Sequence, residues 1–119
     1  MVEKNVAKVT IDYAAELAIE LTAKYFRALG DPTRLRILEI LIDCEMTVTQ
    51  LVERLGMSQS RVSNHLACLR WCNLVSSTAD GRWISYSVTN PNLKTVITLV
   101  RGLVADSAEH VAACTRIDP

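Results

Sequence analysis

The sequence predicts a mostly α-helical protein with one small β-hairpin, organised as a winged helix-turn-helix with extra helices at both ends. Apolar residues recur at helical spacing over most of the 119 residues. Two short helical segments are joined by a turn at Gly56, and the Asp80-Gly81 pair lies between residues typical of strands. Half of the residues are hydrophobic and only 5% are aromatic, which favours aliphatic packing between helices. The length suits one domain covering residues 1–119.

The first helix is expected at residues 12–29. Its apolar face repeats every four residues and consists of Leu17, Leu21 and Tyr25. Gly30 ends this helix, Asp31 is a suitable N-cap for the next one, and Pro32 suits the first helical position. The second helix then has a broad apolar face, made of Leu35, Ile37, Leu38, Leu41 and Ile42.

The helix-turn-helix is predicted at residues 47–72. Thr47 and Gln50 form a capping box at its start, and Gly56 closes its first helix. Ser58 caps the second helix, whose N-terminal half is polar. The apolar stripe of this second helix is Val62, Leu66 and Leu69. A helix with a polar leading face after such a turn is typical of a DNA recognition helix.

The wing is predicted at residues 74–89, where strand-forming residues flank the Asp80-Gly81 turn. The last helix is expected as one long element at residues 91–112. Its apolar stripe is Leu93, Ile97, Val100, Val104 and Val111. A stripe this wide favours helices 12–29 and 91–112 as the seam of a homodimer; the alternative is a helix packed on its own core.

The charge distribution indicates a basic patch on a chain whose formal net charge is zero. Residues 54–86 hold four arginines and one aspartate, so this segment carries +3 and the rest of the chain −3. Such a patch can supply phosphate contacts, although chance scatter of surface charge is the alternative.

Double-stranded operator DNA is the partner that the polar half of the recognition helix predicts. Glutamine and asparagine can bond adenine in pairs, arginine can bond guanine, and serine suits phosphate oxygens. Arg82, just after the hairpin turn, could reach a phosphate or the minor groove. His65 is expected at the DNA or in helix packing rather than as a metal ligand. The candidate DNA-binding residues are Ser58, Gln59, Ser60, Arg61, Ser63, Asn64, His65 and Arg82.

The four cysteines are expected to be reduced thiols. The N-terminus is polar and broken by charges, and no apolar run reaches the roughly 18 residues of a membrane helix. We therefore expect a cytoplasmic protein without a membrane partner, in which a disulfide framework is disfavoured.

Cys68 and Cys72 stand four residues apart on the recognition helix, a spacing that can hold one soft metal ion. The alternative is plain packing, since free cysteine is often buried. A disulfide between them is disfavoured in a regular helix. Cys114 lies in a tail rich in small residues that can fold back on its own or a partner subunit, and Cys44 is a ligand, a buried residue or a free thiol.

Three segments carry a family resemblance: "FRALGDPTRLRILEIL" at 26–41, "TVTQLVERLGMSQSRVSNHLACLRWCNLV" at 47–75 and "DGRWISYSV" at 80–88. They resemble the ArsR/SmtB family of bacterial metal-sensing repressors, and "SNHLACLRWC" resembles its CmtR branch, which senses cadmium and lead. The resemblance implies a homodimeric repressor that is released from its operator by metal. It also implies a trigonal thiolate site made of Cys68, Cys72 and Cys114.

The metal that such a site prefers follows from its sulfur donors. Three thiolates favour thiophilic ions, so cadmium or lead is expected as the effector, with arsenite or mercury as alternatives. Other sites of the family are missing, because the first helix of the helix-turn-helix reads "TQLVERLG" without its C-x-C motif. Asp106 and His110 could at most form a second weak site.

Other functions remain in view. A repressor of the same fold could sense oxidation through a disulfide of Cys72 or Cys114, or it could have no inducer site at all. An enzyme is not expected, because no set of nucleophile, base and acid is apparent.

Overall fold

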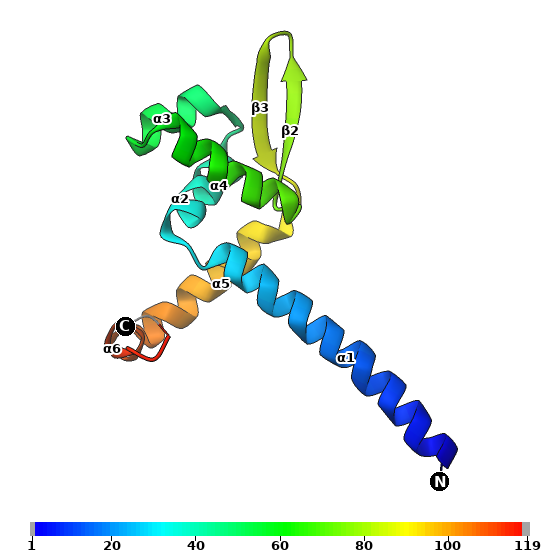
Figure 1. The fold of residues 1–119 in the computed structure, drawn as a ribbon. Helices are drawn as coiled ribbons and strands as arrows, with labels where there is room; N and C mark the ends of the chain where they lie inside the picture. The colour runs from blue at the N-terminus through cyan, green and yellow to red at the C-terminus, as the bar shows by residue number, and fades with distance from the viewer. Residues whose placement is uncertain (1, 118–119) are drawn as a thin grey trace.

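The structure is a computed structural model that describes residues 2–117, with side chains described from Tyr13 onward. Its elements (Figure 1) are α1 (Val2–Leu29), α2 (Pro32–Asp43), β1 (Met46–Thr47), α3 (Val48–Leu55), α4 (Gln59–Trp71), β2 (Val75–Asp80), β3 (Trp83–Val88), α5 (Asn92–Asp106) and α6 (Ala108–Ala113). This order confirms the predicted winged helix-turn-helix with added terminal helices. None of the described helices is both long and apolar enough to cross a membrane.

The core lies where α2, α3 and α4 meet the base of the hairpin. Its largest fully buried side chains are Ile37, Leu38, Leu51, Leu66, Leu69, Leu74, Val62 and Val75. The predicted stripe of α4 is therefore its buried face. The predicted face of α2 is buried at its centre, whereas Leu35 and Ile42 are only partly covered.

The corner between α1 and α2 is held by the D-P-T-R segment. The carboxylate of Asp31 accepts a hydrogen bond from the backbone N–H of Arg34 at 3.0 Å, which caps α2. The guanidinium of Arg34 then reaches back and donates to the carbonyls of Ala28 at 2.6 Å and Arg27 at 3.1 Å. These carbonyls belong to the last turn of α1, and that of Arg27 also accepts the backbone N–H of Gly30 at 3.2 Å. One short segment thus caps both helices.

The Asp31 cap predicts a stability that declines in acid. The Arg34 backbone N–H holds the pKa of Asp31 below its ordinary value of 3.8, with the Arg34 and His65 charges acting in the same direction. A folded pKa below the unfolded one stabilises the protein above that ordinary value, and the effect is lost as pH falls through the folded pKa.

Asp31→Asn should keep the cap but remove the charge, at a cost of about 0.3–1 kcal/mol near neutral pH. The difference from the wild type should shrink from about pH 5 downward in urea unfolding, with Asp80→Asn at the exposed wing turn as the control. A difference that stays constant with pH would contradict this role.

Two helix predictions need correction. Helix α1 begins at Val2 rather than near residue 12. The predicted single helix at 91–112 is wrong: Ser107 interrupts it with φ −126° and ψ 20° and separates α5 from α6. The N–H of Ser107 bonds the carbonyl of Val104, three residues back, as in a tightened last turn.

The sheet has a third strand that the sequence did not reveal. Strand β3 is central in the order β1-β3-β2, and the hairpin register pairs Asp80 with Trp83 across the turn. Strand β1 contributes two residues, with Met46 opposite Tyr86. A strand of two residues is too short to show an alternating pattern in the sequence, so it is recognised only from its pairing with β3.

The molecule is extended for its size. Its radius of gyration is 18.4 Å, whereas a compact chain of this length has about 13.5 Å. Figure 1 shows the reason: α1 projects away from the body as a long arm, and α5 and α6 extend in another direction.

Candidate functional site: a DNA-reading helix that ends in a thiol pair

The recognition helix α4 is set by local caps at its start. Gly56 ends α3 in the left-handed region at φ 65°, which turns the chain toward α4. The hydroxyl of Ser58 accepts a hydrogen bond from the backbone N–H of Arg61 at 3.3 Å. Ser58 is thus the N-cap of α4, so its side-chain oxygen is already engaged by its own helix.

The polar side chains predicted to read DNA gather on the first two turns of α4. Gln59, Ser60, Arg61 and Asn64 are exposed, and Ser63 is half-buried toward the wing. Because Val62 and Leu66 anchor the opposite side in the core, these side chains face outward. This geometry suits the insertion of α4 into a major groove.

His65 is the exception among the predicted DNA residues. Its Nδ1 atom lies 3.8 Å from a carboxylate oxygen of Asp31, and its side chain is largely covered. The histidine therefore links α4 to the start of α2. Of its two predicted roles, this placement favours helix packing.

Arg82 lies at the tip of the wing, immediately after Gly81, which has φ 63°. Arg82 and the neighbouring Trp83 are both exposed. The hairpin rises from the C-terminal end of α4 (Figure 1), so a side chain at its tip can reach a DNA strand next to the recognition helix.

The end of α4 positions Cys72. The N–H of Leu74 bonds the carbonyl of Leu69 at 2.8 Å, the N–H of Asn73 bonds that of Arg70 at 3.0 Å, and Asn73 has φ 59°. This is a Schellman motif, with Asn73 as the left-handed residue and Cys72 as the C-cap. Cys72 thus follows the last helical residue, a small correction to its predicted place within the helix.

Cys68 and Cys72 nevertheless keep their helical relationship. The N–H of Cys72 bonds the carbonyl of Cys68 at 3.1 Å, so the two side chains are neighbours on one face. Both are free, half-buried thiols. At about 100° per residue they project from the flank of α4 opposite Ser63 and Arg70.

Burial raises the pKa of Tyr25 on α1, and the charge of Cys72 acts on it in the same direction.

The remaining predicted ligands lie apart from this pair. Cys114 is exposed at the end of α6, and Cys44 is exposed after α2, with its Sγ 3.4 Å from the carbonyl of Glu45. Among the described side chains of one chain, no group of three His, Cys, Asp or Glu residues is close enough to hold a metal ion. This applies to Cys68, Cys72 and Cys114 and equally to the Asp106 and His110 pair.

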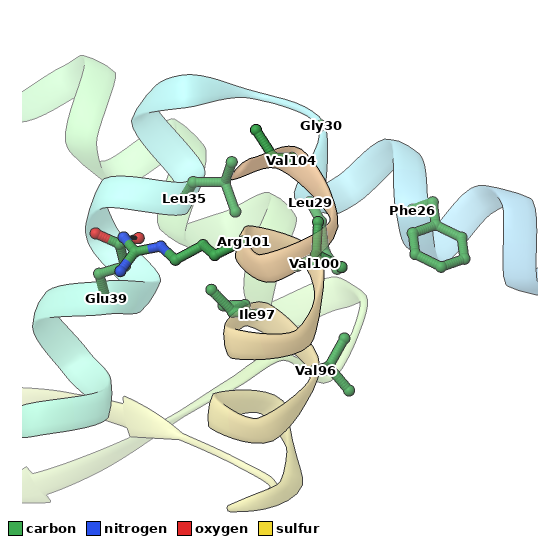
Figure 2. Close-up of a pocket in the computed structure, with 10 residues that line it drawn as sticks. All are labelled: Phe26, Leu29, Gly30, Leu35, Glu39, Val96, Ile97, Val100, Arg101 and Val104. Carbon is green, nitrogen blue, oxygen red and sulfur yellow. Dashed lines mark ion pairs between the residues drawn. The ribbon is translucent and has the colours of Figure 1, made fainter. Parts of the chain in front are cut away.

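A large apolar surface is uncovered on α1 and α5. On α5 it includes Leu99, which is 65% exposed, and Leu103, which is 68% exposed; on α1 it includes Leu17, Leu21 and Phe26. Figure 2 shows a hollow of about 360 Å³ between these helices and α2, bordered by the ion pair of Glu39 with Arg101. Exposed apolar side chains that gather on neighbouring helices are typical of interaction surfaces.

Two residues outside the predicted DNA-binding set, Arg70 and Trp71, line a groove between α4 and the wing. Arg70 was predicted only as one of the four arginines of the basic patch, and Trp71 was not singled out. Their spacing from Ser63, seven and eight residues, could have placed them on the same side of α4, but it could not show what they face.

Comparisons with known proteins agree with this architecture. Residues 31–77 match the family described as "Bacterial regulatory protein, arsR family". The "Probable mercury resistance operon repressor" of Streptomyces lividans is 46% identical over 82% of this chain and 78% of its own length. The "HTH-type transcriptional regulator CmtR" of Mycobacterium tuberculosis is 45% identical over 66% of each chain.

Solved structures show the same fold. The NMR structure of the cadmium sensor CmtR has a TM-score of 0.56 at 45% identity, covering 64% of this chain and 79% of that one. A homodimeric winged helix-turn-helix DNA-binding domain from Mycobacterium bovis has a TM-score of 0.69 at 26% identity, covering 77% of this chain and 84% of that one.

These relatives are transcription regulators, which confirms that the chain is not an enzyme. The matched segment includes the D-P-T-R corner, the helix-turn-helix and both α4 thiols. The chain therefore belongs to the arsR family of bacterial regulatory proteins.

Proposed function

We propose that this chain is a cytoplasmic transcriptional repressor that binds operator DNA as a homodimer and is released when a thiophilic metal ion binds its cysteines. The observation that carries the proposal is the pair of neighbouring thiols, Cys68 and Cys72, at the end of the helix that bears the DNA-reading face. The relatives named for mercury resistance and cadmium sensing support it.

The homodimer is supported by the uncovered apolar surface of α1 and α5 and by the extended shape of one chain. Burying this surface against a second copy removes apolar area from water, the main driving force of association. A two-fold axis also supplies two recognition helices, about one DNA turn apart in a palindromic site.

The third thiol of the proposed site comes from the second copy. Cys72 lies three residues before β2, and the first residue of β2 pairs with the last residue of β3. Helix α5 begins shortly after β3, so Cys72 is near the N-terminal end of α5. Cys114 follows the other end of α5, a helix of 15 residues that spans about 22 Å. A two-fold axis that pairs the α5 helices antiparallel brings each Cys114 toward the thiol pair of the other subunit.

The residues of the proposed site fit a soft cation. Thiolates are the donors that cadmium, lead, arsenite and mercury prefer, and half-burial of Cys68 and Cys72 shields them from water. A bound ion supplies a crosslink between sulfurs. Cys68 and Cys72 lie at the end of the recognition helix, and Cys114 lies at the end of the dimerisation segment. The crosslink therefore fixes the spacing of the two α4 helices and lowers their affinity for the operator.

A complementation titration tests both the ligands and the subunit arrangement. One protomer carries Cys68→Ser with Cys72→Ser, and the other carries Cys114→Ser. Each homodimer alone should lose the thiolate-to-metal charge-transfer absorption that the reduced wild type shows with cadmium or lead under anaerobic conditions. The mixed dimer should regain one site, half of the wild-type amplitude, since one subunit keeps its pair and the other keeps Cys114.

Cys44→Ser is the matched control and should bind one ion per protomer like the wild type. No recovery in the mixed dimer, with clear loss in both parents, would place all three ligands within one subunit. A charge-transfer band indifferent to Cys68 and Cys72 would refute the metal site.

A redox-sensing repressor is the second candidate, supported by the exposure of the Cys114 thiol. It requires an oxidant such as peroxide, which accepts two electrons from two thiols as their sulfurs join in a disulfide. Release of DNA by peroxide in the absence of metal, together with no metal binding by the reduced protein, would favour it.

A further inference from the structure

A groove of about 440 Å³ runs between the second half of α4 and the wing. Its helix side is formed by residues spaced three, four, seven and eight positions apart, which is one continuous stripe of an α-helix. Strand β3 contributes Tyr86 to the opposite wall. The lining residues are Ser63, Leu66, Ala67, Arg70, Trp71 and Tyr86.

The rim of the groove combines one cation with polar and aromatic side chains. Arg70 is exposed, and neither ion pair among the described side chains, His65 with Asp31 or Glu39 with Arg101, involves it. Trp71 is 90% exposed, an unusual state for the largest apolar side chain. Ser63 and Tyr86 add hydroxyl groups, and the small Ala67 leaves the floor open.

This chemistry matches one strand of a DNA backbone. Phosphate oxygens accept charge-assisted hydrogen bonds from arginine and further ones from hydroxyl donors. A deoxyribose presents an apolar face that can pack on an indole ring. The positive charge of Arg70 complements a phosphate, and no acidic side chain lines the groove.

The groove is also continuous with the DNA-reading face. Ser63 belongs to both surfaces, and the stripe continues from it along the same helix toward Trp71. When a recognition helix lies in the major groove, the side of the helix that faces the wing lies next to a sugar-phosphate strand.

We propose that this groove seats one sugar-phosphate strand of the operator, with Arg70 paired to a phosphate and Trp71 packed on a deoxyribose. The inference rests on the proposed DNA binding and deepens it by naming a contact set that positions α4 without reading bases. Arg70 and Trp71 act on affinity for any sequence, whereas Gln59 and Asn64 act on sequence choice.

The test uses the full-length reduced chain and a mixed-sequence DNA duplex, because phosphate contacts do not depend on sequence. Each lost phosphate contact lowers the slope of log affinity against log salt by about one. Arg70→Gln should therefore weaken binding at low salt, and its deficit should shrink about three- to fourfold between 50 and 200 mM salt. Arg36→Gln, an exposed arginine on α2 beside Glu39 and Asp43, is the matched control and should keep the wild-type slope.

Trp71 provides an independent readout, because Trp71 and Trp83 are the two tryptophans of the chain. In Trp83→Phe the emission comes from Trp71 alone, and it should be quenched or shifted as the duplex saturates the protein. In Trp71→Phe the same titration reports Trp83 at the wing tip.

The outcomes separate the inference from the proposed function. Wild-type binding with an unchanged salt slope in Arg70→Gln, or an unchanged Trp71 emission at saturation, would overturn the groove assignment and leave DNA binding standing. Emission of Trp71 that follows protein concentration without DNA would show that a second copy occupies the groove, which also overturns it. A wild type that binds no duplex at low salt would overturn both.

Discussion

Cys68→Ser should leave the operator affinity of the reduced protein within about twofold of the wild type and abolish its release by metal. In the wild type, a coupling of about 1–3 kcal/mol between the two sites corresponds to about 5- to 150-fold weaker DNA binding when the thiols are occupied. Serine keeps the size of the side chain but is a poor ligand for a soft ion. Cys68 lies one helical turn after Asn64, and because serine matches its size, the replacement should leave the neighbouring DNA contacts in place.

The measurement is a fluorescence anisotropy titration of an operator selected by the apo protein from a random-sequence duplex pool, with and without cadmium or lead. Cys44→Ser should keep the full metal response, because that thiol lies exposed in the loop after α2. Loss of operator binding together with loss of the response would mean that Cys68 is structural. Release by peroxide with no response to metal would instead indicate the redox alternative.

Leu103→Glu should convert the protein to a folded monomer and weaken operator binding by at least about 100-fold. Leu103 is 68% exposed in one chain and lies on the apolar face of α5, so the substitution costs one protomer little. In a dimer seam the new carboxylate would be buried beside its two-fold copy, at a cost of several kcal/mol. The loss of affinity follows because two linked recognition helices bind far more tightly than either alone.

Sedimentation equilibrium and operator binding test this prediction, and circular dichroism shows whether the monomer is folded. Thr98→Glu is the matched control, since Thr98 is exposed on the opposite side of the same helix and should leave both dimer and binding intact. A Leu103→Glu protein that remains dimeric would mean that the seam lies elsewhere. A folded monomer with wild-type operator affinity would refute the dimeric mode of binding.

Much of the fold could be predicted because its signals are local. The capping box of Thr47 and Gln50, with both hydrogen bonds present, lies within four residues. The same holds for the Ser58 cap, the Gly56 turn and the Asp80-Gly81 hairpin. In each case a side chain satisfies backbone groups a few positions away, so the pattern of residue types is enough to predict it.

The errors occurred where local signals are weak or absent. The apolar spacing of α5 continues past Ser107 into α6, so the apolar stripe by itself predicted a single helix there. Strand β1 exists because Met46 pairs with Tyr86, forty residues away in the sequence. Whether His65 contacts DNA or Asp31 depends on how α4 packs against α2. The spacing of residues along α4 does not predict that packing.

The candidate site divides in the same way. The sequence by itself determined the recognition helix, the order of its polar residues and the neighbouring thiols, because helical periodicity relates residues four apart without reference to the rest of the chain. Only the tertiary structure decided that Cys114 follows α6, apart from that pair, and that Arg70 and Trp71 border a groove closed by Tyr86. These relationships join segments distant in sequence, and the physical reason is that the direction of α5 and the approach of the wing are set by packing around the shared core.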